Sequence, residues 1–254
     1  MSLSEILQQA KEIAILGGNH TLSYFKKDVE VLSKADESPV TIADRETEEI
    51  LRAEINKRFP GHGIIGEEFG AENEGSDIQW ILDPIDGTKS FIHGIPLYTT
   101  LIGVTINGVP QIGIINAPAT NEICVAGIGE GVTFNGKPCQ VSGQKDLSKA
   151  SLMVTEMYKF QVDGLQDQFM DLMSKTKIHR TWGDAYGHMM VATGRADIMW
   201  DPILNIWDAA ALLPVIKEAG GVYSDMNGVE SIETGSGIST NPHLHEQVIN
   251  IIRK

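Results

Sequence analysis

The chain has 254 residues, of which 42% are hydrophobic and 21% are charged, a composition typical of a folded globular protein rather than a fibrous or disordered one. At ~150 residues per domain, this length predicts a single domain spanning residues 1–254, with two interlocked halves at about 1–145 and 146–254. The formal net charge of -14 disfavours nucleic acid as a partner, and no apolar run approaches the ~18 residues that cross a membrane.

The cysteine content and the N-terminus predict the compartment. Cys124 and Cys139 are too few for a disulfide framework and form no CxxC motif, so we interpret them as free thiols. Free thiols are typical of a reducing cytoplasm. The first residues contain neither a basic segment nor a long apolar one, so no signal peptide is predicted. We therefore expect a cytoplasmic protein.

The first part of the chain predicts two helices. Apolar residues at helical spacing over residues 3–14 predict the first helix, which we expect to end at Gly17-Gly18. Residues 19–40 are mixed and polar and predict a mobile connection. A charge-rich second helix is expected from Thr41 to about Phe59, with Ala43, Thr47, Ile50, Leu51 and Ile55 on its inner side.

The rest of the chain predicts a sheet followed by alternating elements. Residues 80–141 predict a mostly antiparallel sheet, because Asn107-Gly108 and Asn135-Gly136 are strong hairpin signals. A strand is expected at 151–155, with helices near 164–175, 184–193 and 208–219. This order predicts a layered α+β or α/β enzyme core.

Several common catalytic motifs are absent. His245-Glu246 begins an HExxH motif, but Ile249 stands where the second histidine would be. There is no GxSxG elbow and no Walker lysine motif. The run from Gly61 to Gly66 matches GxGxxG literally, yet it follows a predicted helix and enters a strand. A dinucleotide loop requires the reverse order, so no nucleotide cofactor is predicted.

Three acidic clusters follow predicted strands or begin predicted helices. They are Glu67-Glu68, the pair Asp83 and Asp86, and Asp208. Pro84 constrains the backbone between Asp83 and Asp86, so both carboxylates can converge on one point, and the carbonyl of Ile85 can add a third oxygen. Oxygen ligands of this kind suit a hard cation such as Mg²⁺. Taken alone, an Asp-Pro pair usually marks a loop or turn, and an aspartate such as Asp208 before an alanine-rich run is usually a helix N-cap.

A candidate anion site adjoins this cation site. Gly87-Thr88 offers backbone N–H groups and a hydroxyl, which suit a phosphate. A cation site beside an anion cradle is typical of phosphoryl transfer to water.

These motifs resemble the inositol monophosphatase family of Mg²⁺-dependent, lithium-sensitive sugar phosphatases. The residues that carry the resemblance are the run from Asp83 to Phe91 (DPIDGTKSF), the upstream Gly66-Glu67-Glu68, the downstream Trp207-Asp208-Ala209-Ala210, and Glu218-Ala219-Gly220-Gly221. They occur in the family's order and spacing. The resemblance implies a layered α-β-α-β-α sandwich, commonly a homodimer.

The resemblance also implies a role for each matching residue. Glu67, Asp83 and the carbonyl of Ile85 are implied as ligands of a first Mg²⁺, and Asp83, Asp86 and Asp208 as ligands of a second. Glu67 is implied at a third, weaker ion, so two to three Mg²⁺ ions are expected. The implied catalytic residues are Glu67, Thr88 and Asp44, with Thr88 and Asp44 orienting and deprotonating the attacking water. In-line attack then needs no covalent intermediate.

The resemblance also implies a small phosphorylated substrate, and the residues at the helix start near residue 184 indicate which one. Family members that act on inositol or nucleotides typically carry Gly followed by Ser, Thr or Ala at this turn, whereas this chain has Gly183-Asp184. An acid there resembles the histidinol-phosphatase branch, in which Asp184 and Asp201 would pair with the cationic leaving group. The implied substrate-binding residues are Asp86, Gly87, Thr88, Arg180, Asp184 and Asp201.

Each substrate residue has a plainer interpretation. Asp184 is also a candidate helix N-cap, Arg180 a candidate surface ion pair, and Trp182 a candidate packing residue. Histidinol-phosphate phosphatase is accordingly the leading hypothesis, and a phosphatase acting on inositol-1-phosphate or a broad range of sugar phosphates is the alternative. A metal-binding regulatory or RNA-associated protein with the same fold is a third hypothesis, because a fold does not determine function.

Overall fold

The computed structural model describes residues 2–27, 30–33 and 39–253. Its helices are α1 Leu3–Leu22, α2 Ile42–Arg58, α3 Thr88–Ile92, α4 Met157–Val162, α5 Gln166–Lys175, α6 Asp184–Ala192, α7 Ile206–Glu218 and α8 Pro242–Ile252. Its strands are β1 Val31–Ser33, β2 Pro39–Thr41, β3 Gly63–Gly66, β4 Gly70–Glu72, β5 Ile78–Asp86, β6 Thr99–Ile106, β7 Val109–Ala117, β8 Glu122–Gly127, β9 Gly131–Phe134, β10 Lys137–Pro138, β11 Ser151–Met153, β12 Ile178–Arg180, β13 Ile198–Asp201, β14 Val222–Ser224 and β15 Gly237–Thr240.

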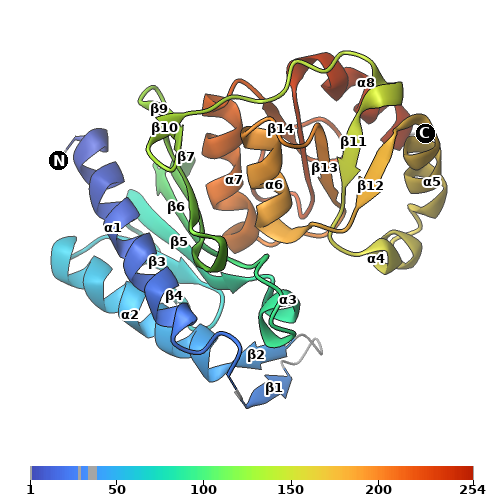
Figure 1. The fold of residues 1–254 in the computed structure, drawn as a ribbon. Coiled ribbons are helices and arrows are strands. Elements are labelled where there is room, and N and C mark those ends of the chain that lie inside the picture. Colours follow the sequence, from blue (N-terminus) through green and yellow to red (C-terminus); the bar gives the residue numbers. More distant parts are fainter. Residues whose placement is uncertain (1, 28–29, 34–38, 254) are drawn as a thin grey trace.

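The elements form five alternating layers (Figure 1). Helices α1 and α2 cover one face of an eight-stranded sheet with the order β10-β9-β8-β7-β6-β5-β3-β4. Helices α6 and α7 lie between its other face and a five-stranded sheet with the order β12-β11-β13-β15-β14. Helices α4, α5 and α8 form the outer layer of the second half. The predicted α-β-α-β-α sandwich is thereby confirmed.

Side chains that alternate in direction along the strands contribute to two hydrophobic cores, one on each face of the large sheet. On β5, Trp80 and Leu82 pack with the apolar faces of α1 and α2, whereas Ile81 packs on the opposite side with α6 and α7. Successive side chains of a strand point to opposite faces, so one strand serves both cores. Strands buried on both faces explain why residues 80–82 form a continuous apolar run.

The expectation that Gly17-Gly18 ends the first helix is wrong, since α1 continues to Leu22. Both glycines lie where the helix contacts its neighbours. A Cβ atom on Gly17 would lie 2.8 Å from Leu51 Cδ2, and one on Gly18 would lie 2.2 Å from Asn116 Nδ2. Asn116 Nδ2 also donates to the carbonyl of Ala14 at 2.9 Å. The glycines therefore allow close packing within the helix instead of terminating it.

The segment expected to be a mobile connection contains regular structure where it is described. Beyond the end of α1, strands β1 and β2 pair antiparallel, with Val31 opposite Thr41. Residues 28–29 and 34–38 lie outside the described residues. Thr41 then caps α2 through a reciprocal capping box with Asp44, which explains why the helix begins there.

The remaining elements agree with the predicted ones in most places. Both hairpins are confirmed, with Ile106 opposite Val109 and Phe134 opposite Lys137. The helices expected near 164–175, 184–193 and 208–219 correspond to α5, α6 and α7, while the short α3 and α4 and the last helix, α8, were not predicted. The large sheet is mostly antiparallel as expected, but β3 pairs with β5 in parallel.

Two further expectations concern the cysteines and the membrane. Cys124 is buried and Cys139 is half-buried, and both are free thiols. Among the described residues, no helix combines the length and the apolar character needed to cross a bilayer.

Candidate active site

The parallel pairing of β3 and β5 brings two acidic clusters together. Gly66, the last residue of β3, is opposite Leu82 of β5 in the ladder. Glu67 follows the end of β3, and Asp83 follows Leu82 within β5. The N–H of Glu67 donates to the carbonyl of Leu82 at 3.2 Å, which continues the ladder by one bond. Glu67 thus lies beside Asp83, although the two residues belong to separate sequence motifs.

An irregularity in β5 places Asp83 and Asp86 on one side. Asp83 is opposite Leu101 and Asp86 is opposite Thr99, so three steps along β5 match two steps along β6. In a regular strand, residues three apart point to opposite faces, and one extra residue restores the same face. The carboxylate of Asp83 also accepts a hydrogen bond from the N–H of Ile85 at 3.0 Å. This β-bulge explains why the Asp-Pro-Ile-Asp spacing suits a shared site.

Asp208 joins the pair from α7. Asn205 caps this helix, and Asp208 returns a hydrogen bond from its third position, accepting the Asn205 N–H at 2.7 Å. Helix α7 packs across β6 and β7, so its N-terminus faces the bulge of β5. Ligand atoms of Asp83, Asp86 and Asp208 all lie within 4.8 Å of one another. The plainer interpretation of Asp208 as an N-cap is wrong, because Asn205 holds that position.

The electrostatics of this cluster favour a bound cation. Burial, and then the charge of Glu67, raises the pKa of Asp83 well above its ordinary value. Burial and the charge of Asp184 do the same to the pKa of Asp86. Burial and Asp86 raise the pKa of Asp208 to about 7. Buried carboxylates that repel one another are costly unless a positive charge compensates them, so these residues fit a divalent metal ion.

Thr88 connects the cluster to a buried carboxylate on α2. Its hydroxyl lies within hydrogen-bond distance of two acceptors, the carbonyl of Ile85 at 3.0 Å and Asp44 Oδ1 at 3.3 Å. The other oxygen of Asp44 accepts from the N–H and the hydroxyl of Thr41, at 2.8 and 2.6 Å. Burial raises the pKa of Asp44. Asp44, the acid of the α2 capping box, is therefore also the support of Thr88.

The acidic cluster forms one wall of a cavity of about 340 Å³ between the two halves. Asp44 does not line this cavity and lies behind Thr88. Arg180 does not line it either; it borders a separate cavity of about 190 Å³ and stacks 5.8 Å from the ring of Trp182. The main cavity is lined by Glu67, Asp83, Ile85, Asp86, Gly87, Thr88, Lys89, Ser90, Thr155, Glu156, Lys159, Thr181, Asp184, Asp201, Ile203, Leu204 and Asp208.

Asp184 lies in this cavity in an unusual backbone conformation. It is the first residue of α6 and has a φ of 52°, which is uncommon for any residue other than glycine. Its N–H donates to Thr155 Oγ1 at 2.7 Å. Gly183, not Asp184, is the N-cap. Burial and the charge of Asp201 raise the pKa of Asp184 to about 7, so the cavity contains a second acidic region beyond the metal cluster.

Sequence reasoning missed His188, which supports Asp201. This fully buried histidine lies 3.2 Å from Asp201 Oδ2 through Nε2 and 2.6 Å from Ser239 Oγ through Nδ1. The N–H of Thr155 donates to the other oxygen of Asp201 at 3.3 Å. A signal was present, because His188 follows Asp184 by four residues and so lies on the same face of α6.

Two lysines that line the cavity were also missed. Lys89 pairs with Glu156 at 2.8 Å and so links the first half of the chain to the second, and Lys159 lies one turn further along α4. Lys89 follows Thr88 directly, so its place in the motif was a usable signal. A cation beside the metal cluster is suited to contact a phosphate.

Comparison with known proteins agrees with this geometry. The sequence model of the inositol monophosphatase family matches residues 2–254. The chain belongs to the inositol monophosphatase family. It is 43% identical to the histidinol-phosphatase of Chlorobaculum parvum over 97% of this chain and 96% of that protein. It is 37% identical to the histidinol-phosphatase of Mycobacterium tuberculosis over 87% of each.

A solved structure supports the same assignment. The inositol monophosphatase from Anabaena superposes with a TM-score of 0.87 at 30% identity, covering 100% of this chain and 97% of that one. The chain is thus a phosphoric monoester hydrolase of this family, as the acidic cluster and the anion cradle predicted.

Proposed function

We propose that this phosphatase hydrolyses histidinol phosphate in an Mg²⁺-dependent reaction. The observation that carries the choice of substrate is the second acidic region of the cavity, formed by Asp184 and Asp201. A cationic leaving group such as histidinol carries an ammonium that these carboxylates can pair with. The sequence identity of 43% and 37% to two proteins named histidinol-phosphatase supports the same choice.

The residues that would hold Mg²⁺ are Glu67, Asp83, Asp86 and Asp208, together with the carbonyl of Ile85. All are oxygen donors, which Mg²⁺ prefers, and all line the cavity. Bound there, Mg²⁺ neutralises phosphate charge and lowers the pKa of a water molecule. The raised pKa of Asp208 means that protons compete with the metal below about pH 7.

Thr88 and Asp44 provide the proton path for the attacking water. Thr88 lines the cavity, so its oxygen can accept a proton from a water placed there. Its own proton has two acceptors, the carbonyl of Ile85 at 3.0 Å and Asp44 Oδ1 at 3.3 Å, and the proposed path uses the second. Because Thr41 holds the other oxygen of Asp44, the accepting atom stays in place. A positioned base of this kind typically contributes ~10²–10⁴ in rate.

The phosphate and its leaving group would occupy neighbouring parts of the cavity, since a Cβ atom on Gly87 would lie 3.0 Å from Asp184 Oδ2. Gly87, Thr88 and Lys89 face the phosphate, with Gly87 and Thr88 at the start of α3. Asp184 and Asp201 face the leaving group. No role is assigned to Arg180, since it borders the separate cavity.

An inositol or sugar phosphate is the second candidate substrate. The likeness to a structure named inositol monophosphatase favours it. Phosphate release from histidinol phosphate, inositol-1-phosphate and fructose bisphosphate, compared by kcat/KM, separates the two. A preference for histidinol phosphate is expected, and a preference for inositol-1-phosphate would replace the proposal with the alternative.

We also propose a cytoplasmic homodimer that is sensitive to lithium, on the strength of family membership. Light scattering coupled to size exclusion measures the mass in solution. Inhibition by Li⁺ is measured at fixed Mg²⁺. A monomeric mass would contradict the proposed homodimer, and activity that Li⁺ leaves unchanged would contradict the proposed lithium sensitivity.

A further inference from the structure

We propose that Glu48 and Arg52 form a positioning pair that holds the acidic turn, which we define as residues 67–69 between β3 and β4. The pair lies on α2 and touches neither the cavity nor the reacting groups. Its effect would reach the site through Glu67, the first residue of the turn. The inference rests on the proposed function, because Glu67 matters only if it holds a metal ion.

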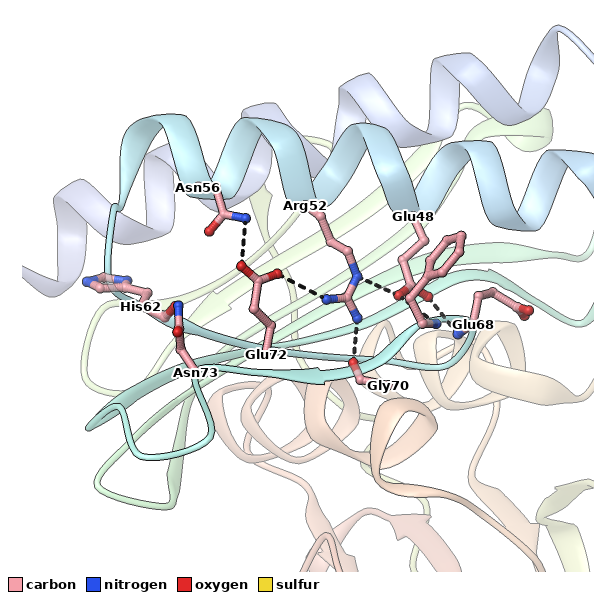
Figure 2. A network of polar contacts seen from close by, with 9 residues as sticks. Glu48, Arg52, Asn56, His62, Glu68, Gly70, Glu72 and Asn73 are labelled. Carbon is pink, nitrogen blue, oxygen red and sulfur yellow. Dashed lines mark hydrogen bonds and ion pairs between the residues drawn. The ribbon is translucent and has the colours of Figure 1, made fainter.

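Glu48 is bonded to the backbone that follows Glu67 (Figure 2). Its side chain is fully buried. Oε2 accepts the N–H of Glu68 at 2.7 Å, and Oε1 accepts the N–H of Phe69 at 3.2 Å. Hydrogen bonds to an ionised carboxylate are the stronger kind, so the turn is held by two of them in succession.

Arg52 completes the pair and reaches the far end of the turn. Its Nε donates to Glu48 Oε1 at 2.8 Å, and its Nη2 donates to the carbonyl of Gly70. Nη1 of Arg52 lies 3.5 Å from Glu72 Oε2. The other carboxylate oxygen of Glu72 accepts a hydrogen bond from Asn56 at 3.3 Å. Figure 2 shows this row of contacts running from α2 along β4. The arginine balances the buried charge of Glu48 and attaches β4 to α2.

Besides the pair, an antiparallel ladder with β3 holds β4, and Arg45 lies 5.3 Å from the centre of the Phe69 ring. Strand β4 is a three-residue edge strand whose residues are all exposed, so little apolar burial fixes it. Phe69 remains 38% exposed. The polar contacts of Glu48 and Arg52 therefore act together with this ladder in fixing where the turn lies.

Gly66 shows how closely the pair approaches the strand. A Cβ atom there would lie 2.0 Å from Glu48 Oε1 and 2.8 Å from Arg52 Nη2. Gly66 is also opposite Leu82, the residue before Asp83. Glu67 is thus held on one side by its own bond to Leu82 and on the other by the pair that contacts its neighbours.

The expected consequence is weaker metal binding when the pair is broken. Groups that orient a ligand typically change metal affinity or activity ~10–100-fold when they are removed. Glu48→Gln keeps the size of the side chain but replaces one accepting oxygen with an NH2 group, which cannot accept from the turn. Saturating Mg²⁺ should restore most of kcat, since Thr88 and Asp44 are untouched.

The chain offers a matched control on the same helix. Glu54 also pairs with an arginine four residues later, at 3.0 Å from Arg58 Nε, but this pair does not contact the turn. Glu54→Gln therefore removes the same charge and the same kind of pair from α2 without the predicted effect.

The test measures Mg²⁺ binding by calorimetry on the full chain without substrate, together with amide hydrogen exchange of the metal-free protein. For Glu48→Gln we expect the dissociation constant to rise about 10–100-fold and the amides of Glu68 and Phe69 to exchange at least about tenfold faster. Glu54→Gln should leave both within about twofold. Wild-type affinity and exchange in a folded Glu48→Gln variant would overturn the proposal, as would an equal loss in both variants.

Arg52→Met provides a second variant if Glu48→Gln does not fold. It should weaken Mg²⁺ binding in the same direction and speed exchange at Phe69. Unchanged Mg²⁺ binding in a folded Arg52→Met variant would also refute the positioning role of Glu48 and Arg52. If the wild-type chain releases no phosphate from any monoester yet these binding changes occur, the proposed function fails and the positioning pair stands.

Discussion

Replacing Asp208 with asparagine should stabilise the metal-free protein while it weakens Mg²⁺ binding. In the metal-free fold, burial and Asp86 raise the pKa of Asp208 from 3.8 to about 7. At ~1.4 kcal/mol per pH unit, keeping this carboxylate ionised above pH 7 costs on the order of 4 kcal/mol relative to the unfolded chain. Asparagine removes that charge and keeps an oxygen for the Asn205 N–H, which Asp208 accepts at 2.7 Å.

The net gain should be smaller than this figure. The carboxylate of Asp208 is only half-buried, and Asp83 and Asp86 share in the electrostatic repulsion. Burying the amide of the asparagine also costs free energy. We expect a gain of about 1–2 kcal/mol, which raises the Tm by about 2–8 °C for a chain of this size. Asp167→Asn is the matched control, because Asp167 is an exposed aspartate in the first turn of α5. It should leave the Tm unchanged or slightly lower, since it loses a favourable helix-dipole contact.

The assay is thermal unfolding near pH 8, in chelator and in saturating Mg²⁺. In chelator, Asp208→Asn should melt above wild type. In Mg²⁺ the order should reverse, because wild type gains binding energy that the variant lacks. A lower Tm for Asp208→Asn in chelator, or an equal Mg²⁺-dependent gain in both proteins, would refute the reasoning.

Other predictions follow from the same site. Thr88→Ala should lower kcat by ~10²–10⁴ with little change in Mg²⁺ affinity measured by calorimetry; a kcat within twofold would leave Thr88 as a turn residue only. Asp184→Asn should lower kcat/KM about ten- to a hundredfold for histidinol phosphate alone, because a charge-assisted hydrogen bond is worth ~1.5–3 kcal/mol; an equal loss for inositol-1-phosphate would contradict this. Burial raises the pKa of Asp184 and of Asp208 from 3.8 to about 7, so the metal-free fold retains protons that the unfolded chain has released. Its stability should therefore fall as pH rises from about 4 to about 7, and a Tm in chelator that rises across this window would oppose the assignment.

Local motifs were enough to predict that Asp83, Asp86 and Asp208 form an acidic cluster. Asp83, Asp86 and Asp208 follow apolar strands or begin a helix, and buried carboxylates need compensation wherever they occur. Pro84 was expected to constrain the backbone so that Asp83 and Asp86 converge, and the structure has a β-bulge between these two residues. These signals are short-range, so they are readable without knowing how the strands pair.

Long-range packing was not predictable in the same way. The parallel pairing that places Glu67 beside Asp83 depends on which strands become neighbours. Gly17-Gly18 has the sequence of a helix stop, yet the approach of Leu51 and Asn116 makes it a packing site. Both outcomes depend on tertiary contacts that no local window contains.

Glu48 shows where helical periodicity was underused. It lies on the inner face of α2 with Ala43, Thr47, Leu51 and Ile55, all of which are buried. An acid on an apolar face is costly unless it is paired, so its position already indicated a buried partner. That the partner includes the backbone beside Glu67 could be seen only in the fold.

Phosphate release from histidinol phosphate by the purified chain, measured with Mg²⁺ and with chelator, tests the proposed function most directly. We expect turnover that requires Mg²⁺ and a higher kcat/KM than for inositol-1-phosphate. Undiminished turnover in chelator would contradict the metal site, and the absence of release from histidinol phosphate in saturating Mg²⁺ would contradict the substrate.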